Sequence, residues 1–220
     1  MADDKYSSLR ALDALQSRSL EGKREYVASL EARGDEQALS LLVECLCDES
    51  AFLRGLAEGA LSRLGQRAVD ALLPHLTQGL WFTRLSASRV LGELGAREAL
   101  AGLVEQAGDA NRSVAETAVE AIVRVAAKGQ VVSTARALHR APEAVRERVL
   151  AAAQRVGGEV SAQLARTLGD RELMAARADE VVGEAPPPDA HEGVEWELLT
   201  GREAPVAAPD TETPERRDPD

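Results

Sequence analysis

Two twelve-residue segments of the chain, residues 54–65 and 84–95, repeat one helical pattern. Each begins with Arg, carries Ala with Leu or Val at the three- and four-residue spacing of a buried helix face, and ends in Leu-Gly. A glycine after a helix can adopt the left-handed conformation that terminates it. The pattern therefore predicts two equivalent helices that end at Gly65 and Gly95.

The same end position recurs along the chain. Gly34, Gly65, Gly95 and Gly157 share it, with Ala126 in the equivalent place, and successive positions are 30 or 31 residues apart. Apolar residues in the preceding helix of each unit follow the same period. A helical repeat of this length is typical of solenoids, in which stacked helix pairs share one core. The sequence therefore predicts an all-α protein, an α-solenoid of about six antiparallel helix pairs.

The expected solenoid spans residues 1–183, and each repeat unit contains two short helices. Its units are residues 5–34, 36–65, 66–95, 98–128, 130–157 and 159–183. Pro74 falls inside the first helix of the third unit, where it removes a backbone donor and predicts a kink. Pro142 stands where proline is favoured, at the start of a helix.

The composition changes after residue 183. Three consecutive prolines, at 186–188, are followed by residues rich in Glu, Asp, Pro, Ala and Thr, a composition that predicts a disordered acidic tail over residues 184–220. Residues 194–199, Val-Glu-Trp-Glu-Leu-Leu, interrupt it. We interpret Trp196, Leu198 and Leu199 as a short linear motif that orders on binding. The alternative is a chance apolar cluster.

The net charge of −11 belongs mostly to this tail, which has 11 acidic and 3 basic residues and leaves −3 for the first 183. Such a body lacks the basic surface of nucleic-acid-binding proteins. No run reaches the roughly 18 apolar residues of a membrane span, so we expect no membrane insertion. The acidic, polar first residues do not resemble a secretory signal, and they predict a cytoplasmic location.

The sequence offers little for catalysis or metal binding, which need convergent polar side chains. His75 and His139 occupy different positions in different units, and His191 lies in the tail. Cys45 and Cys47 point to different faces of a helix, so we expect small buried side chains rather than a disulfide or a metal site. We therefore predict no catalytic, cofactor-binding or metal-binding residues, and no enzyme.

The phrases at 54–65 and 84–95 resemble HEAT repeats, especially the short bacterial kind grouped with phycobilisome-lyase HEAT-like repeats. Those families carry an Asp in the turn, then an Arg near the start of the second helix, then alanines and a closing Leu-Gly. Asp48 and Asp109 match the turn position, and Arg54 and Arg84 match the helix start. The resemblance covers roughly residues 9–182 and implies an α-solenoid used as a binding surface.

Aromatic residues are scarce, at 3% of the chain, and three of them gather at equivalent turns. Phe52 precedes Arg54, and Trp81 and Phe82 precede Arg84; Phe52 and Phe82 each stand 13 residues before the closing Gly. Stacked repeats would place them side by side along one rim. They either cap the core where the two helices meet or form an aromatic ridge for a partner, since Trp and Arg are favoured at interface hot spots.

We therefore predict a non-enzymatic scaffold or adaptor that binds protein partners through one face or rim of the solenoid. The alternative, suggested by the resemblance, is a chromophore or cofactor lyase or chaperone. The predicted partner-binding residues are Phe52, Arg54, Trp81, Phe82 and Arg84 in the repeats and Trp196, Leu198 and Leu199 in the tail. The tail motif would bind another protein or fold back onto its own solenoid.

Overall fold

A computed structural model describes residues 19–170 and Met174, and every element in this part of the chain is helical. The first helix of the expected first unit, the second helix of the last unit except Met174, and the tail lie outside the described residues. The elements are α2 (Leu20–Arg33), α3 (Glu36–Leu46), α4 (Ala51–Leu64), η1 (Gly65–Ala68), α5 (Val69–Leu72), η2 (Leu73–Leu76), α6 (Trp81–Leu94), η3 (Arg97–Ala99), α7 (Leu100–Gln106), α8 (Arg112–Ala127), α9 (Val131–His139), α10 (Glu143–Val156) and α11 (Gly158–Gly169). The expected all-α class is confirmed.

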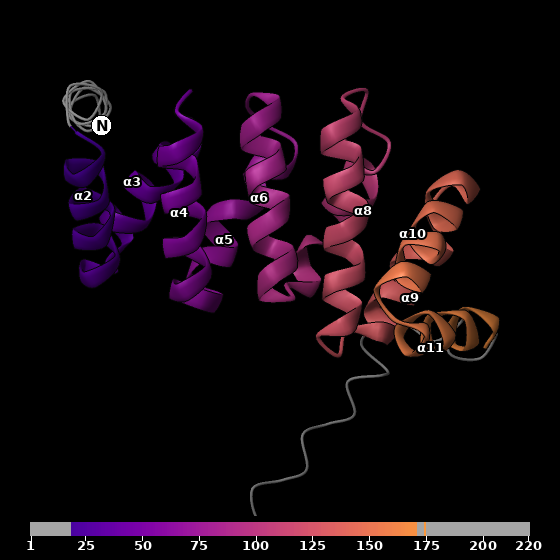
Figure 1. The fold of residues 1–220 in the computed structure, drawn as a ribbon. Coiled ribbons are helices and arrows are strands. Elements are labelled where there is room, and N and C mark those ends of the chain that lie inside the picture. Colours follow the sequence, from indigo (N-terminus) through magenta and orange to yellow (C-terminus); the bar gives the residue numbers. More distant parts are fainter. Residues whose placement is uncertain (1–18, 171–173, 175–220) are drawn as a thin grey trace, which may run out of the picture. The chain divides into compact units, whose positions relative to one another are not determined.

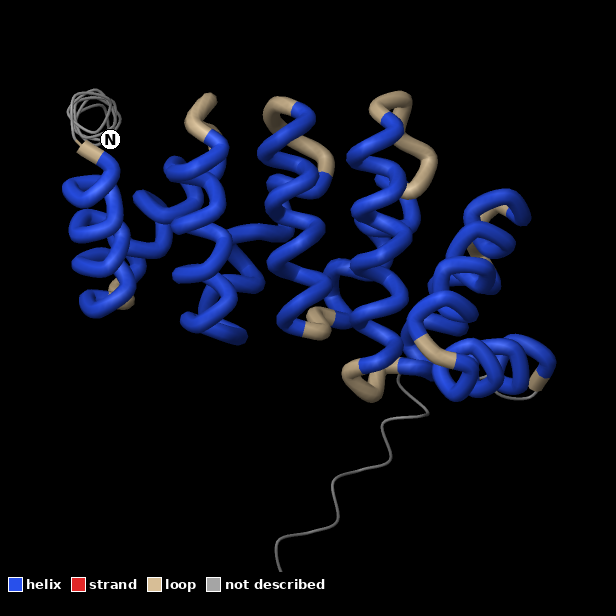
Figure 2. The backbone as a smooth tube through the Cα atoms, in the orientation of Figure 1, coloured by secondary structure: helices blue, strands red, loops and turns tan. Residues whose placement is uncertain are grey.

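The described helices form two layers. The longer helices α2, α4, α6 and α8 lie side by side in chain order, and each contacts the next (Figure 1). The shorter α3, α5 and α7 pack against α4, α6 and α8 respectively and make the second layer, and short loops at the helix ends connect the layers (Figure 2). After α8, helix α10 packs on α8, and α11 packs on α9 and α10.

The core between the layers is built from Leu, Val, Ile and Ala. Leu42, Leu61, Leu91 and Ile122 are fully buried, and they belong to one continuous cluster of apolar side chains. Removing such aliphatic surface from water is the main favourable term for a domain of this kind. The small side chains among them let neighbouring helices approach closely.

Glycine ends the second helix of three expected units as predicted. The φ values are 54° at Gly34, 66° at Gly65 and 70° at Gly95, in the region that favours glycine. The expectation is wrong at the other two marks. Helix α8 runs past Ala126 to Ala127, and the positive φ falls on Gly129; Gly157, with φ 167°, is extended. Alanine at position 126 has a Cβ that disfavours the left-handed conformation, so the helix continues.

Both prolines act as predicted. The first helix of the third unit is divided into η1, α5 and η2 around Pro74, which has no backbone N–H to donate. Pro142 directly precedes α10. No helix in the described part of the chain is long and apolar enough to cross a membrane.

The two cysteines differ in exposure. Cys45 is fully buried, as expected, and this burial raises the pKa of its thiol to about 12. Cys47, which was expected to be buried, is exposed at the end of α3. Two residues along a helix turn the side chain by about half a revolution, and only the first position faces the core.

Candidate partner-binding groove between α4 and α6

The predicted aromatic residues lie in the first turns of α4 and α6. Trp81 is the first residue of α6 and is 47% exposed, and the preceding Leu80 is 58% exposed. Phe52 and Phe82 are half-buried. Neither expectation therefore describes all three rings: the phenylalanines pack partly on the core, while Trp81 stands at the surface.

Arginine side chains cover the two phenylalanine rings in the same way. The Arg54 guanidinium carbon lies 4.5 Å from the centre of the Phe82 ring, and Trp81 meets Phe82 edge-on with centroids 5.6 Å apart. One unit earlier, Arg24 lies over Phe52 at 5.4 Å. Both contacts fall within the range of cation–π attraction. Arg24 was missed by the sequence analysis, although it precedes Arg54 by the repeat period of 30 residues.

Arg54 also fixes the turn before its own helix. Its Nη1 donates to the carbonyl oxygens of Asp48, at 2.8 Å, and Glu49, at 2.9 Å. These carbonyls follow the end of α3, where backbone acceptors lack helical partners. Arg54 therefore connects the α3–α4 turn to the aromatic start of α6.

A groove of about 160 Å³ opens between α4 and α6 at this place. Its apolar end is lined by Trp81, Phe82 and Leu85 of α6. On the α4 side stand Arg54 and Gly55, and a side chain added at Gly55 would meet no atom within 4 Å. The missing side chain at residue 55 keeps this wall of the groove open.

The other end of the groove is polar. Glu58 of α4 accepts hydrogen bonds from Arg89 Nη1, at 2.9 and 3.2 Å, and from Ser86 Oγ, at 2.5 Å. Its side chain is only 14% exposed, and that of Arg89 is 43% exposed. The sequence suggested contacts within one helix, between Arg89 and Glu93. The structure instead pairs Arg89 with Glu58 across two helices, one repeat period of 31 residues apart.

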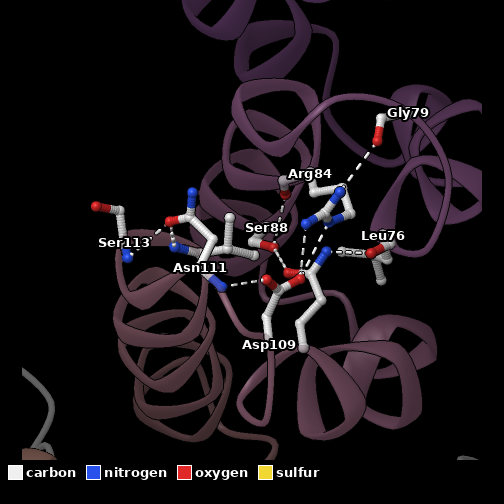
Figure 3. A network of polar contacts seen from close by, with 9 residues as sticks. Leu76, Gly79, Arg84, Ser88, Asp109, Asn111 and Ser113 are labelled. Carbon is white, nitrogen blue, oxygen red and sulfur yellow. Dashed lines mark hydrogen bonds and ion pairs between the residues drawn. The ribbon is translucent and has the colours of Figure 1, made fainter.

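Arg84 belongs to a different network, shown in Figure 3. Its Nη2 contacts Asp109 Oδ2 at 2.8 Å, and its Nη1 donates to the Gly79 carbonyl at 3.0 Å. Asp109 Oδ1 in turn accepts from the Asn111 backbone N–H at 2.7 Å. Arg84 therefore links α6 to the turn before α8, and it does not line the groove.

A buried hydrogen-bond chain lies beside this pair. The Ser88 hydroxyl contacts Gln106 Oε1 and the Arg84 carbonyl, and Gln106 Nε2 donates to the Leu76 carbonyl (Figure 3). Ser88 and Gln106 are almost fully buried, and their polar atoms are satisfied within the fold. This network joins α6, α7 and η2 and leaves no polar group there for a ligand.

The remaining predicted site residues, Trp196, Leu198 and Leu199, lie outside the described residues. Within residues 19–170, no group of three or more His, Cys, Asp and Glu side chains is placed to hold a metal ion. The structure thus brings together Arg54, Trp81 and Phe82, keeps Phe52 one unit away under Arg24, and turns Arg84 toward α8.

No model of a known protein family matches the chain, and its sequence matches no curated protein. The resemblance to HEAT repeats therefore stays a prediction from the repeat phrases.

Proposed function

We propose that the protein is a HEAT-like α-solenoid scaffold that binds a protein partner in the groove between α4 and α6. The observation that carries the proposal is the apolar surface at the start of α6. Among the described residues, the exposed large apolar side chains are Leu20, Leu80, Trp81 and Val156, and two of these four are adjacent at the mouth of the groove. Exposed apolar surface beside a cleft is a common mark of a protein-binding site.

The composition of the groove also supports protein binding. Tryptophan and arginine are the residues most enriched at interface hot spots, and Trp81, Arg54 and Arg89 all line this groove. Stacking on Phe82 and pairing with Glu58 hold the two arginines in place, so little side-chain entropy is lost when a partner binds.

The size of the groove favours a peptide side chain over a cofactor. Small-molecule sites usually have volumes of about 300–1,000 Å³ and enclose most of their ligand. The groove of about 160 Å³ is smaller and accommodates one large side chain. This observation supports a scaffold rather than the lyase alternative.

Photo-crosslinking in the producing cells tests this proposal. A benzophenone amino acid replaces Ala51, an exposed residue at the edge of the groove, in the full chain. The matched control carries the same amino acid at Ala151, an exposed position on α10. We expect a protein adduct, identified by mass spectrometry, from position 51 and not from position 151. The same adducts from both positions, or none from position 51, would contradict the proposal.

A further inference from the structure

The groove has more hydrogen-bond donors than acceptors. A guanidinium group carries five N–H donors on three nitrogens. Among the described residues, Arg54 uses only Nη1, for the turn carbonyls, and Arg89 uses only Nη1, for Glu58. The Nε and Nη2 groups of both arginines are therefore available to a ligand.

The one carboxylate in the groove is already occupied. Glu58 Oε1 accepts from Ser86 and Arg89, and Oε2 accepts from Arg89 as well. Because its charge is paired and largely buried, Glu58 contributes little attraction for a cation. The unused polar groups along the groove are thus cationic donors, which match an anionic acceptor.

The start of α6 adds to this preference. Ser50 caps α4 and Asn111 caps α8 through side-chain acceptors, whereas α6 is preceded by Leu80, which has none. The first backbone N–H groups of a helix lack intrahelical partners and favour negative charge. This feature supports the assignment but does not carry it; the unused donors of the two arginines do.

We propose that the groove binds a short acidic peptide segment of a partner protein. One apolar or aromatic side chain of the segment packs against Trp81 and Leu85 in the space beside Gly55. A Glu or Asp one or two residues away pairs with the free donors of Arg89 or Arg54. This inference rests on the proposed function and specifies the chemistry of the partner.

The probe is a synthetic, fluorescently labelled peptide with the sequence of residues 192–201, which places a Trp between two Glu residues. Its comparison peptide carries Lys at both Glu positions next to the Trp. The protein is the full chain with W196A, L198A and L199A, so that its own copy of this sequence does not compete. Fluorescence anisotropy measures both dissociation constants.

We expect the acidic peptide to bind at least about tenfold more tightly than the Lys peptide, because charge-assisted hydrogen bonds are among the strongest. Added salt should reduce this ratio. Arg89→Gln should move the ratio toward one, a change in selectivity that a purely structural role of Arg89 would not produce.

Gly55→Leu fills the groove where a side chain meets no atom, so it should weaken binding of the acidic peptide about tenfold or more. Ala151→Leu, on α10, is the matched control and should change nothing. Trp81→Ala provides a second groove variant whose exposed position does not endanger folding.

Equal binding of both peptides, abolished by Gly55→Leu, would overturn the acidic chemistry while leaving the groove as a protein-binding site. Undetectable binding of the acidic peptide would overturn the inference as well. Unchanged binding of the acidic peptide by Gly55→Leu and Trp81→Ala would overturn the groove as its site. The crosslinks from position 51 report on the proposed function independently of either peptide.

Discussion

Helix α6 has two different interfaces with its neighbours of the same layer. Toward α4 it leaves a groove, and a Cβ added at Gly55 of α4 would meet nothing within 4 Å. Toward α8 it packs so closely that a Cβ added at Gly92 would lie 2.7 Å from the Cα of Ala121. Equivalent units of one repeat thus produce an open α4–α6 interface and a closed α6–α8 interface.

The difference follows from a few side chains at equivalent positions. Arg54 at the open interface stacks on Phe82, whereas the residue 31 positions after Phe82 is Ser113, which offers no ring to Arg84. Arg84 pairs instead with Asp109. A repeat therefore sets the path of the chain, while single residues decide which interface remains accessible to a partner.

The most severe test of this comparison makes the same substitution at both interfaces. Gly92→Ala forces a methyl group against the backbone of α8, and we expect it to lower the free energy of unfolding by about 3 kcal/mol. Gly55→Ala meets no atom and improves helix propensity, so it should raise the free energy of unfolding by about 0.5–1 kcal/mol. Urea unfolding followed by circular dichroism measures both changes.

Losses of similar size in the two alanine variants would show that the α4–α6 interface is as tightly packed as the α6–α8 interface. A stabilised Gly55→Ala variant would also show that the open position is not required for folding.

A second test concerns the turn aspartates. Asp109→Ala removes the Arg84 pair and the turn acceptor together, with an expected loss of about 2 kcal/mol, because Arg84 is left partly buried without its partner. Asp48→Ala removes only the hydrogen bond to the Ser50 backbone N–H, with an expected loss of about 1 kcal/mol. Equal losses in urea unfolding would mean that the ion pair adds nothing to the closed interface.

The sequence predicted those parts of the fold that depend on local patterns. Periodic apolar residues and the glycine marks located the helices from α2 to α10, because helix formation and helix ends respond to nearby residues. Ala126 and Gly157 were placed wrongly, because a helix continues wherever no residue stops it and because an extended glycine has the same letter as a left-handed one.

The site was predicted less completely, since it depends on contacts between helices. Trp81, Phe82 and Arg54 were found because aromatic residues are rare and lie at equivalent turns. Glu58 and Arg89 were missed because charged residues on one helix suggested partners at i+4. Their contact crosses one repeat period, and only the packed helices reveal which side chains meet across it.

A third test separates the rim of the open interface from the core. Trp81→Ala should change the free energy of unfolding by less than about 0.5 kcal/mol, because the ring is exposed. Phe82→Ala should cost about 1 kcal/mol, because Arg54 loses the ring on which it stacks. The double variant should nevertheless lose the partner crosslink from position 51 while its helical circular dichroism persists. A large loss of stability in Trp81→Ala would instead identify the ring as part of the core.

The smallest expected effect is on pH dependence at the closed side of α6. His75 in η2, which packs against α6 and α7, has a pKa lowered by burial, and its Nδ1 has no hydrogen-bond partner among the described residues. The unfolded chain therefore takes up a proton first as the pH falls. Stability should be unaffected above about pH 7.5, fall as the pH passes through about 6.5, and level off below the lowered folded pKa.

Melting temperatures at about pH 7.5 and about pH 5.5 measure this loss, which should shrink in His75→Gln. The matched control, His139→Gln, changes an exposed histidine on α9 and should leave the difference as it is. Because η2 contacts α6 and α7, hydrogen exchange at the lower pH should increase more in α6 and α7 than in α4. An equal increase in α4 would mean that protonation weakens both interfaces of α6 alike, so that the open and closed interfaces are not energetically separate.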